Sequence, residues 1–306
     1  MPLTTQQQKS LLQQQESLSF FNKVAEDWKK RAVSAEADSV NVIRQRNGVV
    51  LHVIQNRSST HATLDVGCGT GELVCDIARK NISSEGIDFA PEMIRIAKES
   101  AQKESLALVK FHCLSVFDFS WPIEQYDVIS ANGFLEYISF EEQLRFLDLA
   151  KAALTKNGSL VVGSRNRLFN LFSMNTFTTR EMEGNTVIPL LKEAMALASG
   201  ASMSDFLAME TPPLQEANIA LSKTADVEVS TRYQFTPAQI LQLLKKKGFE
   251  PLELYPIHVH GVLPQFKKQY PGIHAGIANL LHQYQTSVPE LLIPHASSFL
   301  VHAKKV

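Results

Sequence analysis

The sequence predicts an α/β protein built on a mostly parallel sheet, and three features of the chain predict this class. A short apolar run at 63–66 leads into three glycines at alternate positions. The apolar spacing of a helix follows directly, at 72–78. Strand-like and helix-like segments then alternate as far as residue 163, which is typical of a parallel sheet covered by helices on both faces. A chain of 306 residues is long enough to bury such a core.

Residues 1–60 are expected to form an N-terminal helical segment, since Phe20, Phe21, Val24, Ala25 and Trp28 share one face of a helix. The first part of the α/β core should span 61–166. Its strands are expected near 63–66, 85–88, 108–113, 127–131 and 160–163, and its helices near 72–80, 91–103 and 141–154. The Asn157-Gly158 pair is typical of a helix end, and we expect it to follow the last of these helices.

The alternation stops after Ser164. The following stretch, 167–230, is rich in Phe, Met, Ala and Leu, and we expect it to form short helices inserted after the fifth strand. Loops at the carboxyl edge of such a sheet line the ligand crevice, so this insertion is predicted to cap the crevice as a mobile lid. The core resumes over 231–306, where Thr236-Pro237 begins a helix and two further strands follow near 250–258 and 297–303.

The composition is 44% hydrophobic and 20% charged, with a net charge of −1, which is typical of a soluble globular protein. Because no excess positive charge is available to neutralise phosphates, nucleic acid is not an expected partner. Three cysteines form no disulfide framework and lack metal-ligand spacing with histidine, so no metal is expected. A reducing cytoplasm fits this usage, and the sequence shows neither a signal peptide nor a run of about 20 apolar residues for a membrane span.

The glycine stretch reads Asp65-Val66-Gly67-Cys68-Gly69-Thr70-Gly71. Glycines suit a turn that a ligand approaches closely, because no Cβ stands in the way. A dinucleotide-binding fingerprint, G-x-G-x-x-G, would need its third glycine at position 72, which is Glu72. Asp88 ends the second strand about 20 residues after the glycines, where a carboxylate can bind ribose hydroxyls. The pattern therefore favours a nucleoside-containing ligand other than a dinucleotide.

Together these segments resemble motif I and the following acidic residue of class I S-adenosylmethionine-dependent methyltransferases. The stretch from Phe20 to Trp28 resembles the opening of ubiquinone-biosynthesis-type O-methyltransferases. The resemblance implies a Rossmann-like seven-stranded sheet of order 3-2-1-4-5-7-6 whose final strand is antiparallel. It also implies S-adenosyl-L-methionine as cofactor, S-adenosyl-L-homocysteine as product and a small molecule as methyl acceptor.

The same resemblance assigns cofactor contacts residue by residue. Gly67 and Gly69 should lie under the homocysteine part, and Asp65 should meet its amino group. Asp88 should accept hydrogen bonds from the ribose, a bidentate role that suits a carboxylate. The full set of expected cofactor residues is Trp28, Asp65, Gly67, Gly69, Gly71, Asp88, Phe89, Ser115, Val116 and Asn132.

Within that set, Trp28 should cover the methionine part, Phe89 should pack on the adenine face and Asn132 should face the methionine part. Ser115 stands where the family usually has an aspartate that reads the adenine amino group. Either the Ser115 hydroxyl or Asp118 is expected to accept that hydrogen bond. Trp28 also has a purely structural interpretation, because aromatic side chains most often pack cores.

Two histidines flank the end of the sixth strand. His258 and His260 share one strand face on the crevice side, and histidine is the side chain best suited to act as a base near neutral pH. They are the candidate catalytic residues, with a structural hydrogen-bonding role as the alternative. Arg165, Asn166, Phe169 and Phe172 follow the fifth strand and are the candidate substrate contacts.

The function predicted from these residues is transfer of a methyl group from S-adenosylmethionine to a hydroxyl of a small molecule. Two alternatives stay open at this point. One is N- or C-methylation of a small molecule or peptide, since only the two histidines favour a hydroxyl acceptor. The other is a non-catalytic subunit that binds S-adenosylmethionine, because a fold by itself does not determine activity.

Overall fold

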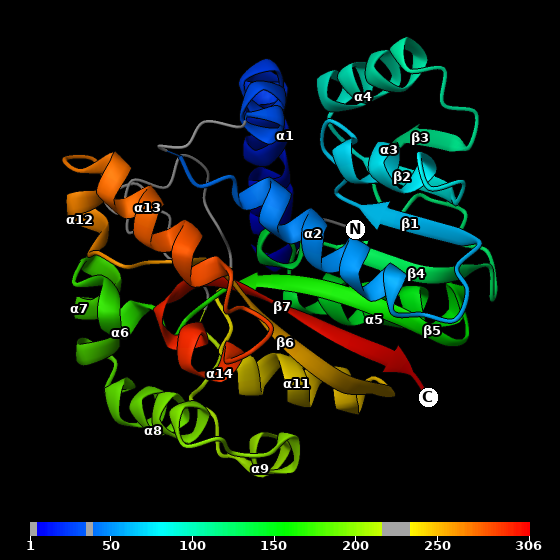
Figure 1. The fold of residues 1–306 in the computed structure, drawn as a ribbon. Coiled ribbons are helices and arrows are strands. Elements are labelled where there is room, and N and C mark those ends of the chain that lie inside the picture. Colours follow the sequence, from blue (N-terminus) through cyan, green and yellow to red (C-terminus); the bar gives the residue numbers. More distant parts are fainter. Residues whose placement is uncertain (1–4, 35–38, 216–232) are drawn as a thin grey trace.

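The computed structural model describes residues 5–34, 39–215 and 233–306, and its centre is one seven-stranded sheet (Figure 1). The sheet order is β3-β2-β1-β4-β5-β7-β6. Strands β3, β2, β1, β4 and β5 pair in parallel, whereas β7 runs antiparallel to both β5 and β6. The predicted class, order and antiparallel final strand are therefore confirmed. The strands are β1 (Ala62–Val66), β2 (Ser83–Asp88), β3 (Val109–Cys113), β4 (Tyr126–Ala131), β5 (Leu154–Arg165), β6 (Phe249–Val259) and β7 (Ala296–Lys305).

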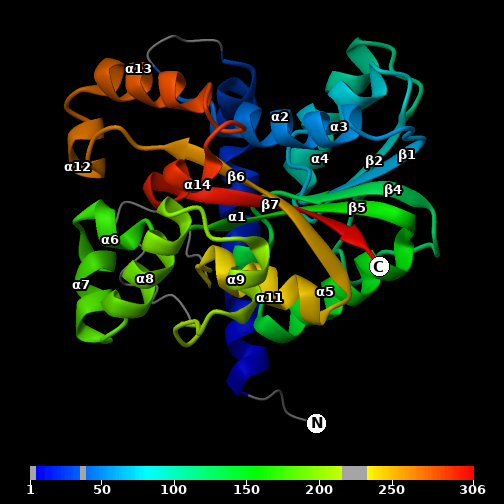
Figure 2. The same cartoon turned by 60° about the horizontal axis from the view of Figure 1, so that its bottom comes forward.

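Helices cover both faces of the sheet (Figure 2). On one face lie α2 (Val42–Gln55), α3 (Glu72–Ala78) and α4 (Pro91–Lys103), and on the other lie α5 (Phe140–Ala153) and α11 (Pro237–Lys246). Apolar side chains of α2 and α3 pack against Val128, Val161 and Ile257 of the sheet. The opposite face is the larger core, where Phe146 and Leu241 are fully buried. Each strand face is thus removed from water, which is the main driving force for this architecture.

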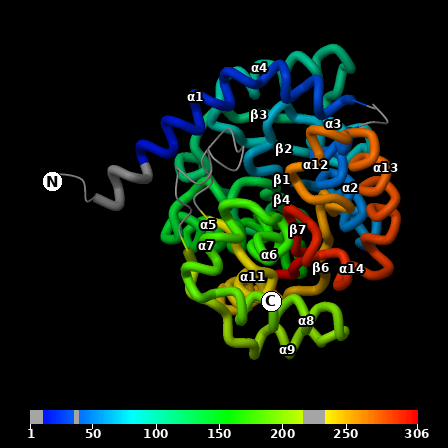
Figure 3. The backbone as a smooth tube through the Cα atoms, turned by 90° about the vertical axis from the view of Figure 1, so that its left-hand side faces the viewer, coloured from blue at the N-terminus to red at the C-terminus, as the bar shows by residue number. Residues whose placement is uncertain are grey.

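The long helix α1 (Thr5–Val33) crosses the carboxyl edge of the sheet. Figure 3 shows it lying beside α4, where Ala25 and Trp28 pack against Met93. Nearer its N-terminal end, the Gln14 amide donates a hydrogen bond of 2.8 Å to Glu142 in α5. One helix therefore bridges elements from the two faces of the sheet and covers the edge between them.

Local signals predicted some boundaries correctly and misplaced others. The predicted helix start at Thr236 is confirmed, since its hydroxyl and the Gln239 side chain form a reciprocal capping box. The helix predicted near 141–154 is α5, which ends at Ala153, but the Asn157-Gly158 pair lies inside β5 and does not cap that helix. Asn157 takes a left-handed φ of 62° inside β5, where the pairing with β4 shifts register. Asn and Gly suit such an irregularity as well as they suit a helix end.

The insertion after β5 begins as short helices, as expected. They are α6 (Asn170–Ser173), α7 (Thr176–Glu183), α8 (Val187–Ala198) and α9 (Met203–Ala208). Residues 216–230 of the predicted cap lie outside the described part of the chain. Leu168, Leu190 and Leu197 of the described part are buried in the same core as α5 and α11. This packing ties the described part of the insertion to the fold, and its movement as a lid stays a prediction.

A buried ion pair anchors this insertion. The Arg167 guanidinium donates to both carboxylate oxygens of Glu181, at 3.0 and 2.8 Å, and both side chains are almost fully buried. The Arg167 side chain also donates to the carbonyl of Pro213, 2.7 Å away, and Asn170 donates to Glu181. These bonds hold the start, middle and end of the described insertion together.

The chain between β6 and β7 contains helices that the sequence patterns did not reveal. They are α12 (Pro264–Lys267), α13 (Pro271–His282) and α14 (Pro289–Leu292), followed by the 3₁₀ turn η2 (Ile293–His295). A second 3₁₀ turn, η1 (Leu135–Tyr137), follows β4. None of the described helices has both the length and the apolar character needed to cross a membrane.

Candidate functional site

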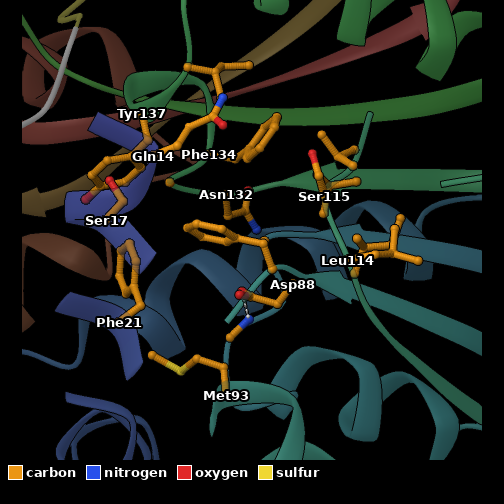
Figure 4. A pocket seen from close by; sticks show the side chains of 18 of the residues that line it. Gln14, Ser17, Phe21, Asp88, Met93, Leu114, Ser115, Asn132, Phe134 and Tyr137 are labelled. Carbon is orange, nitrogen blue, oxygen red and sulfur yellow. Dashed lines mark hydrogen bonds between the residues drawn. The ribbon is translucent and has the colours of Figure 1, made fainter. Parts of the chain in front are cut away.

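A pocket lies where β1, β2 and β4 end, between the carboxyl edge of the sheet and α1 (Figure 4). Eight of the predicted cofactor residues line it: Trp28, Gly67, Gly69, Asp88, Phe89, Ser115, Val116 and Asn132. Asp65 lines a second, adjoining hollow that shares Trp28, Gly67, Gly69 and Asn132 with the first. The topology thus brings together residues from five separate segments of the sequence.

The glycine turn shapes the floor of the pocket. Gly67 and Gly69 have left-handed φ angles of 71° and 53°, and a Cβ on Gly69 would lie 3.4 Å from the Trp28 ring nitrogen. Gly71 is needed for close packing, because a Cβ there would lie 2.8 Å from Ala97 and 2.9 Å from Phe111. Gly71 therefore allows α3 to pack closely, and among the described residues it lies outside the lining of both hollows.

The two predicted acidic residues sit on neighbouring strand ends. Asp88 accepts hydrogen bonds from the backbone nitrogens of Gly69 (3.0 Å) and Ala90 (2.9 Å), one on each carboxylate oxygen. Burial raises the pKa of Asp88 to about 6 even though these hydrogen bonds oppose the shift. Each carboxylate oxygen keeps a further lone pair for a donor in the pocket.

Asp65 is buried more deeply than its neighbour. The Ser130 hydroxyl donates a hydrogen bond of 2.6 Å to its carboxylate. The pKa of Asp65 is raised to about 7, mainly by burial and to a smaller extent by the nearby charges of Asp88 and Glu72. A positively charged group beside this buried carboxylate would stabilise its ionised form.

Asn132 provides the clearest sign of a ligand. Neither its amide nitrogen nor its amide oxygen has a hydrogen-bond partner among the described residues, although both atoms are buried. The side chain lines both hollows, at the end of β4. A buried polar group left without a partner costs roughly 1–3 kcal/mol, so such groups point to a missing ligand or water.

Several lining residues were missed by the sequence analysis. Gln14, Ser17 and Phe21 line the pocket from α1. They are spaced i, i+3 and i+7 and therefore share one helix face, a signal that was available in the sequence. Arg46 lines both hollows from α2, and its guanidinium occupies the space next to Gly133. No local pattern marks Arg46, because only the packing of α2 places it there.

Phe134 and Tyr137 complete the lining after β4. Figure 4 shows Gln14, Ser17, Phe21 and Tyr137 on one side of the pocket and Leu114 and Ser115 on the other. Asp88 and Asn132 lie between these two sides. The pocket thus has a half lined by β2 and β3 and a half lined by α1 and the segment after β4.

The adenine contact stays a prediction. The Ser115 hydroxyl lies in the pocket lining and accepts a hydrogen bond of 3.3 Å from the Phe117 backbone nitrogen. Its oxygen still has capacity to bond an exocyclic amine. Asp118, the alternative hydrogen-bond acceptor for the adenine amino group, is not among the described residues that line the pocket. The geometry favours Ser115 of the two.

None of the four candidate substrate residues is among the described residues that line this pocket. The Asn166 amide donates to the carbonyls of Ile293 (2.6 Å) and Ala296 (2.9 Å), so it ties the end of β5 to the segment before β7. The Arg165 side chain lies 3.9 Å from Glu136. Phe169 and Phe172 pack against imidazoles, with ring centroids 4.6 Å from His260 and 4.7 Å from His295. Their contact with substrate remains a prediction.

The candidate bases also lie outside the described pocket lining. His258 and His260 gather with His274 of α13, and the rings of the first two have centroids 4.2 Å apart. The backbone nitrogen of His258 donates a hydrogen bond of 2.8 Å to the Gln45 side chain of α2, next in sequence to Arg46, which lines the pocket. A role for either histidine as general base is therefore still a prediction, and the structure offers no contact in its favour.

The strand order and the pocket at the ends of β1, β2 and β4 define the class I methyltransferase fold. A family model described as a methyltransferase domain matches residues 57–248, which is more than half of the chain. The chain therefore belongs to this family of methyltransferase domains.

Curated relatives point in the same direction. The chain is similar to a ubiquinone biosynthesis O-methyltransferase of Coxiella burnetii, with 24% identity over 51% of this chain and 64% of the relative. A relative of the same description from Bradyrhizobium diazoefficiens is 32% identical over 36% of this chain and 42% of the relative. This chain thus matches about two-thirds or less of the length of these relatives.

Solved structures share the fold at low identity. One is a magnesium protoporphyrin IX methyltransferase from Synechocystis with bound S-adenosylhomocysteine, at TM-score 0.57 and 13% identity over 96% of this chain and all of that chain. Another is a Burkholderia thailandensis 1,6-didemethyltoxoflavin-N1-methyltransferase, at TM-score 0.55 and 14% identity over all of this chain and 92% of that chain. These likenesses concern the fold.

Proposed function

We propose that this protein transfers a methyl group from S-adenosyl-L-methionine to a hydroxyl group of a small molecule. The observation that carries the proposal is the unpartnered amide of Asn132, which lines one hollow with Asp88 and the adjoining hollow with Asp65. These groups match a ligand that carries an amino group at one end and a ribose at the other. Membership of the methyltransferase family makes S-adenosylmethionine the cofactor that fits this description.

The half of the pocket next to β2 and β3 suits the nucleoside. Asp88 has lone pairs left for two ribose hydroxyls, and Ser115 lies on the side where adenine would be read. Phe89 and Leu114 provide apolar surface for the base. The residue types in this half of the pocket therefore suit a nucleoside.

The glycine turn suits the methionine end of the cofactor. Asp65 would pair with the amino group, and Asn132 would gain the hydrogen bonds that it lacks. Arg46 lines both hollows and its Nε has no partner among the described residues, so it is available to the carboxylate. A guanidinium binds a carboxylate through two parallel hydrogen bonds, which would also fix the orientation.

The other half of the pocket would receive the acceptor. When bound, the sulfonium supplies an already activated methyl group, so the protein contributes position and exclusion of water. Trp28 and Phe21 pack edge to face at 6.0 Å between ring centroids and shield this side. Gln14, Ser17 and Tyr137 place polar groups around an apolar surface. That lining suits an aromatic or apolar molecule carrying a hydroxyl.

A hydroxyl acceptor is favoured by the relatives, which are named as ubiquinone biosynthesis O-methyltransferases. The test is methyl transfer from isotope-labelled S-adenosylmethionine to a panel of phenols, alcohols and amines, with the methylated atom located by NMR. We expect labelled phenolic ethers, and Asn132→Ala should abolish the signal at subsaturating cofactor. Products methylated only on nitrogen or carbon would refute O-methylation. Cofactor binding with no turnover on any acceptor would favour the non-catalytic alternative.

A further inference from the structure

Three histidines that lie outside the described lining of the pocket gather at the end of β6. His258 lies next to the last residue of the strand, His260 follows the strand, and His274 comes from α13. One ring nitrogen from each can be chosen so that all three lie within 4.8 Å of one another. The His258 and His274 Nε2 atoms are 2.9 Å apart.

The backbone is arranged to bring these rings together. His258 has a left-handed φ of 54°, which is uncommon for a residue with a side chain and usually persists at functional positions. Gly261 allows α13 to approach, because a Cβ there would lie 1.9 Å from Ile277. Without this close approach His274, one turn earlier in α13, would lie farther from the end of β6.

The hydrogen bonds in the cluster leave three of its six ring nitrogens without a partner among the described residues. One bond joins His258 to His274, and the Ser297 hydroxyl lies 3.3 Å from Nδ1 of His258. Both ring nitrogens of His260 and Nδ1 of His274 are buried without a partner among the described residues. Three unpaired nitrogens in one buried cluster are more than a merely structural role requires.

All three rings are at least partly buried, and burial disfavours their charged forms. Burial lowers the pKa of His258, and the same cause lowers the pKa of His260 to about 3. Burial also lowers the pKa of His274, and Lys267 adds to the effect on all three rings. Neutral imidazoles offer lone pairs, and metal ligands must be deprotonated.

We propose that His258, His260 and His274 bind a divalent transition-metal ion, for which Zn²⁺ is the natural probe. Imidazole nitrogens suit zinc, and three of them with one open position is a known arrangement of zinc sites. The Ser297 contact on Nδ1 leaves Nε2 of His258 for the metal and fixes the ring orientation. The short distance between Nε2 of His258 and of His274 would open slightly around the ion. This site is independent of the proposed methyl transfer.

The first test is metal binding by the purified full-length chain after treatment with a chelator. Calorimetric titration with Zn²⁺ should show one equivalent bound, and the melting temperature should rise with zinc concentration. His260→Ala and His274→Ala should each weaken binding by more than roughly 100-fold, beyond the effect typical of outer-shell changes. His282→Ala is the matched control, because His282 lies on the same helix α13 but outside the cluster.

A second measurement works on the unaltered chain. X-ray absorption of the zinc-loaded protein should show imidazole nitrogen at about 2.0–2.1 Å from the metal. Retained S-adenosylhomocysteine binding by His260→Ala and His274→Ala would show that the variants are folded. The proposal is overturned if the unaltered chain binds no stoichiometric zinc, or if zinc binding survives both substitutions. A metal coordinated by oxygen alone would overturn it as well.

Discussion

Replacing Asp65 with Asn should stabilise the ligand-free protein while weakening its cofactor binding. Burial raises the pKa of Asp65 from 3.8 to about 7. The folded state therefore favours the protonated form, and this group lowers stability increasingly as the pH rises from the unfolded pKa through the folded one. A neutral amide has no ionised form, so this pH-dependent loss should disappear in Asp65→Asn.

The magnitude follows from the size of the pKa shift. A pKa raised by about three units on folding lowers the free energy of unfolding by about 4 kcal/mol at about pH 8. At about pH 5 the same group lowers it by less than about 2 kcal/mol. The amide oxygen can still accept the Ser130 hydrogen bond, but the new amide nitrogen has no acceptor identified beside it. That unpaired donor costs roughly 1–3 kcal/mol at every pH. We expect a net gain of about 1–3 kcal/mol at about pH 8.

The assay is urea denaturation of the two proteins, without ligand, at several pH values. The difference between the pH values is the more reliable quantity, because the cost of the unpaired amide cancels from it. Stability of the variant relative to the unaltered protein should increase by about 2 kcal/mol between pH 5 and pH 8. In the same samples, affinity for S-adenosylhomocysteine should fall, since the amide cannot neutralise an amino group. A stability difference independent of pH would refute the assignment of Asp65 as a buried, destabilised carboxylate.

Further predictions concern the glycine turn, Trp28, the candidate base His260 and the insertion after β5. In calorimetry, Gly69→Val should reduce affinity for S-adenosylhomocysteine more severely than Trp28→Ala. The branched side chain would fill the pocket floor, and valine would have to adopt the left-handed φ of this position. Equal losses of affinity in the two variants would contradict this. His260→Gln should keep cofactor affinity, and unchanged turnover per folded molecule would exclude His260 as general base, whereas a fall of roughly 10²–10⁴ would support it. Glu181→Ala should cost roughly 3–5 kcal/mol in denaturant unfolding, since it leaves Arg167 buried without its partner, and a cost below about 1 kcal/mol would disprove the anchoring role.

The residues of this site that directly follow successive strands could be predicted from the sequence. The glycine turn and Asp88 lie about one strand–helix unit apart, so their spacing alone predicts that they share one edge of the sheet. Ser115 and Asn132 follow the next two strands and were predicted for the same reason. Alternation of strands and helices predicted the sheet, because each element must bury its own apolar face.

Contacts made by packing between distant elements were not predictable in this way. Arg46 reaches the pocket only because α2 lies across the sheet, and His274 reaches His258 only because α13 approaches Gly261. Helix α13 itself was missed, since the sequence patterns indicated no element between the sixth and seventh strands. The apolar residues of the insertion are compatible both with a lid and with a fixed core. Leu168 and Leu190 lie in the core, and movement of the insertion stays a prediction.

The central claim is that the pocket at the ends of β1, β2 and β4 binds S-adenosylmethionine through Asp88. Calorimetry with S-adenosylhomocysteine on the unaltered protein and on two aspartate variants tests it most directly. Asp88→Ala should lose about 1–3 kcal/mol or more of binding free energy, because the ribose hydroxyls lose their acceptor. Asp118→Ala is the control and should bind normally, since Asp118 lies outside the lining of the pocket in the described chain. Unchanged affinity in a folded Asp88→Ala protein would contradict the placement of the cofactor.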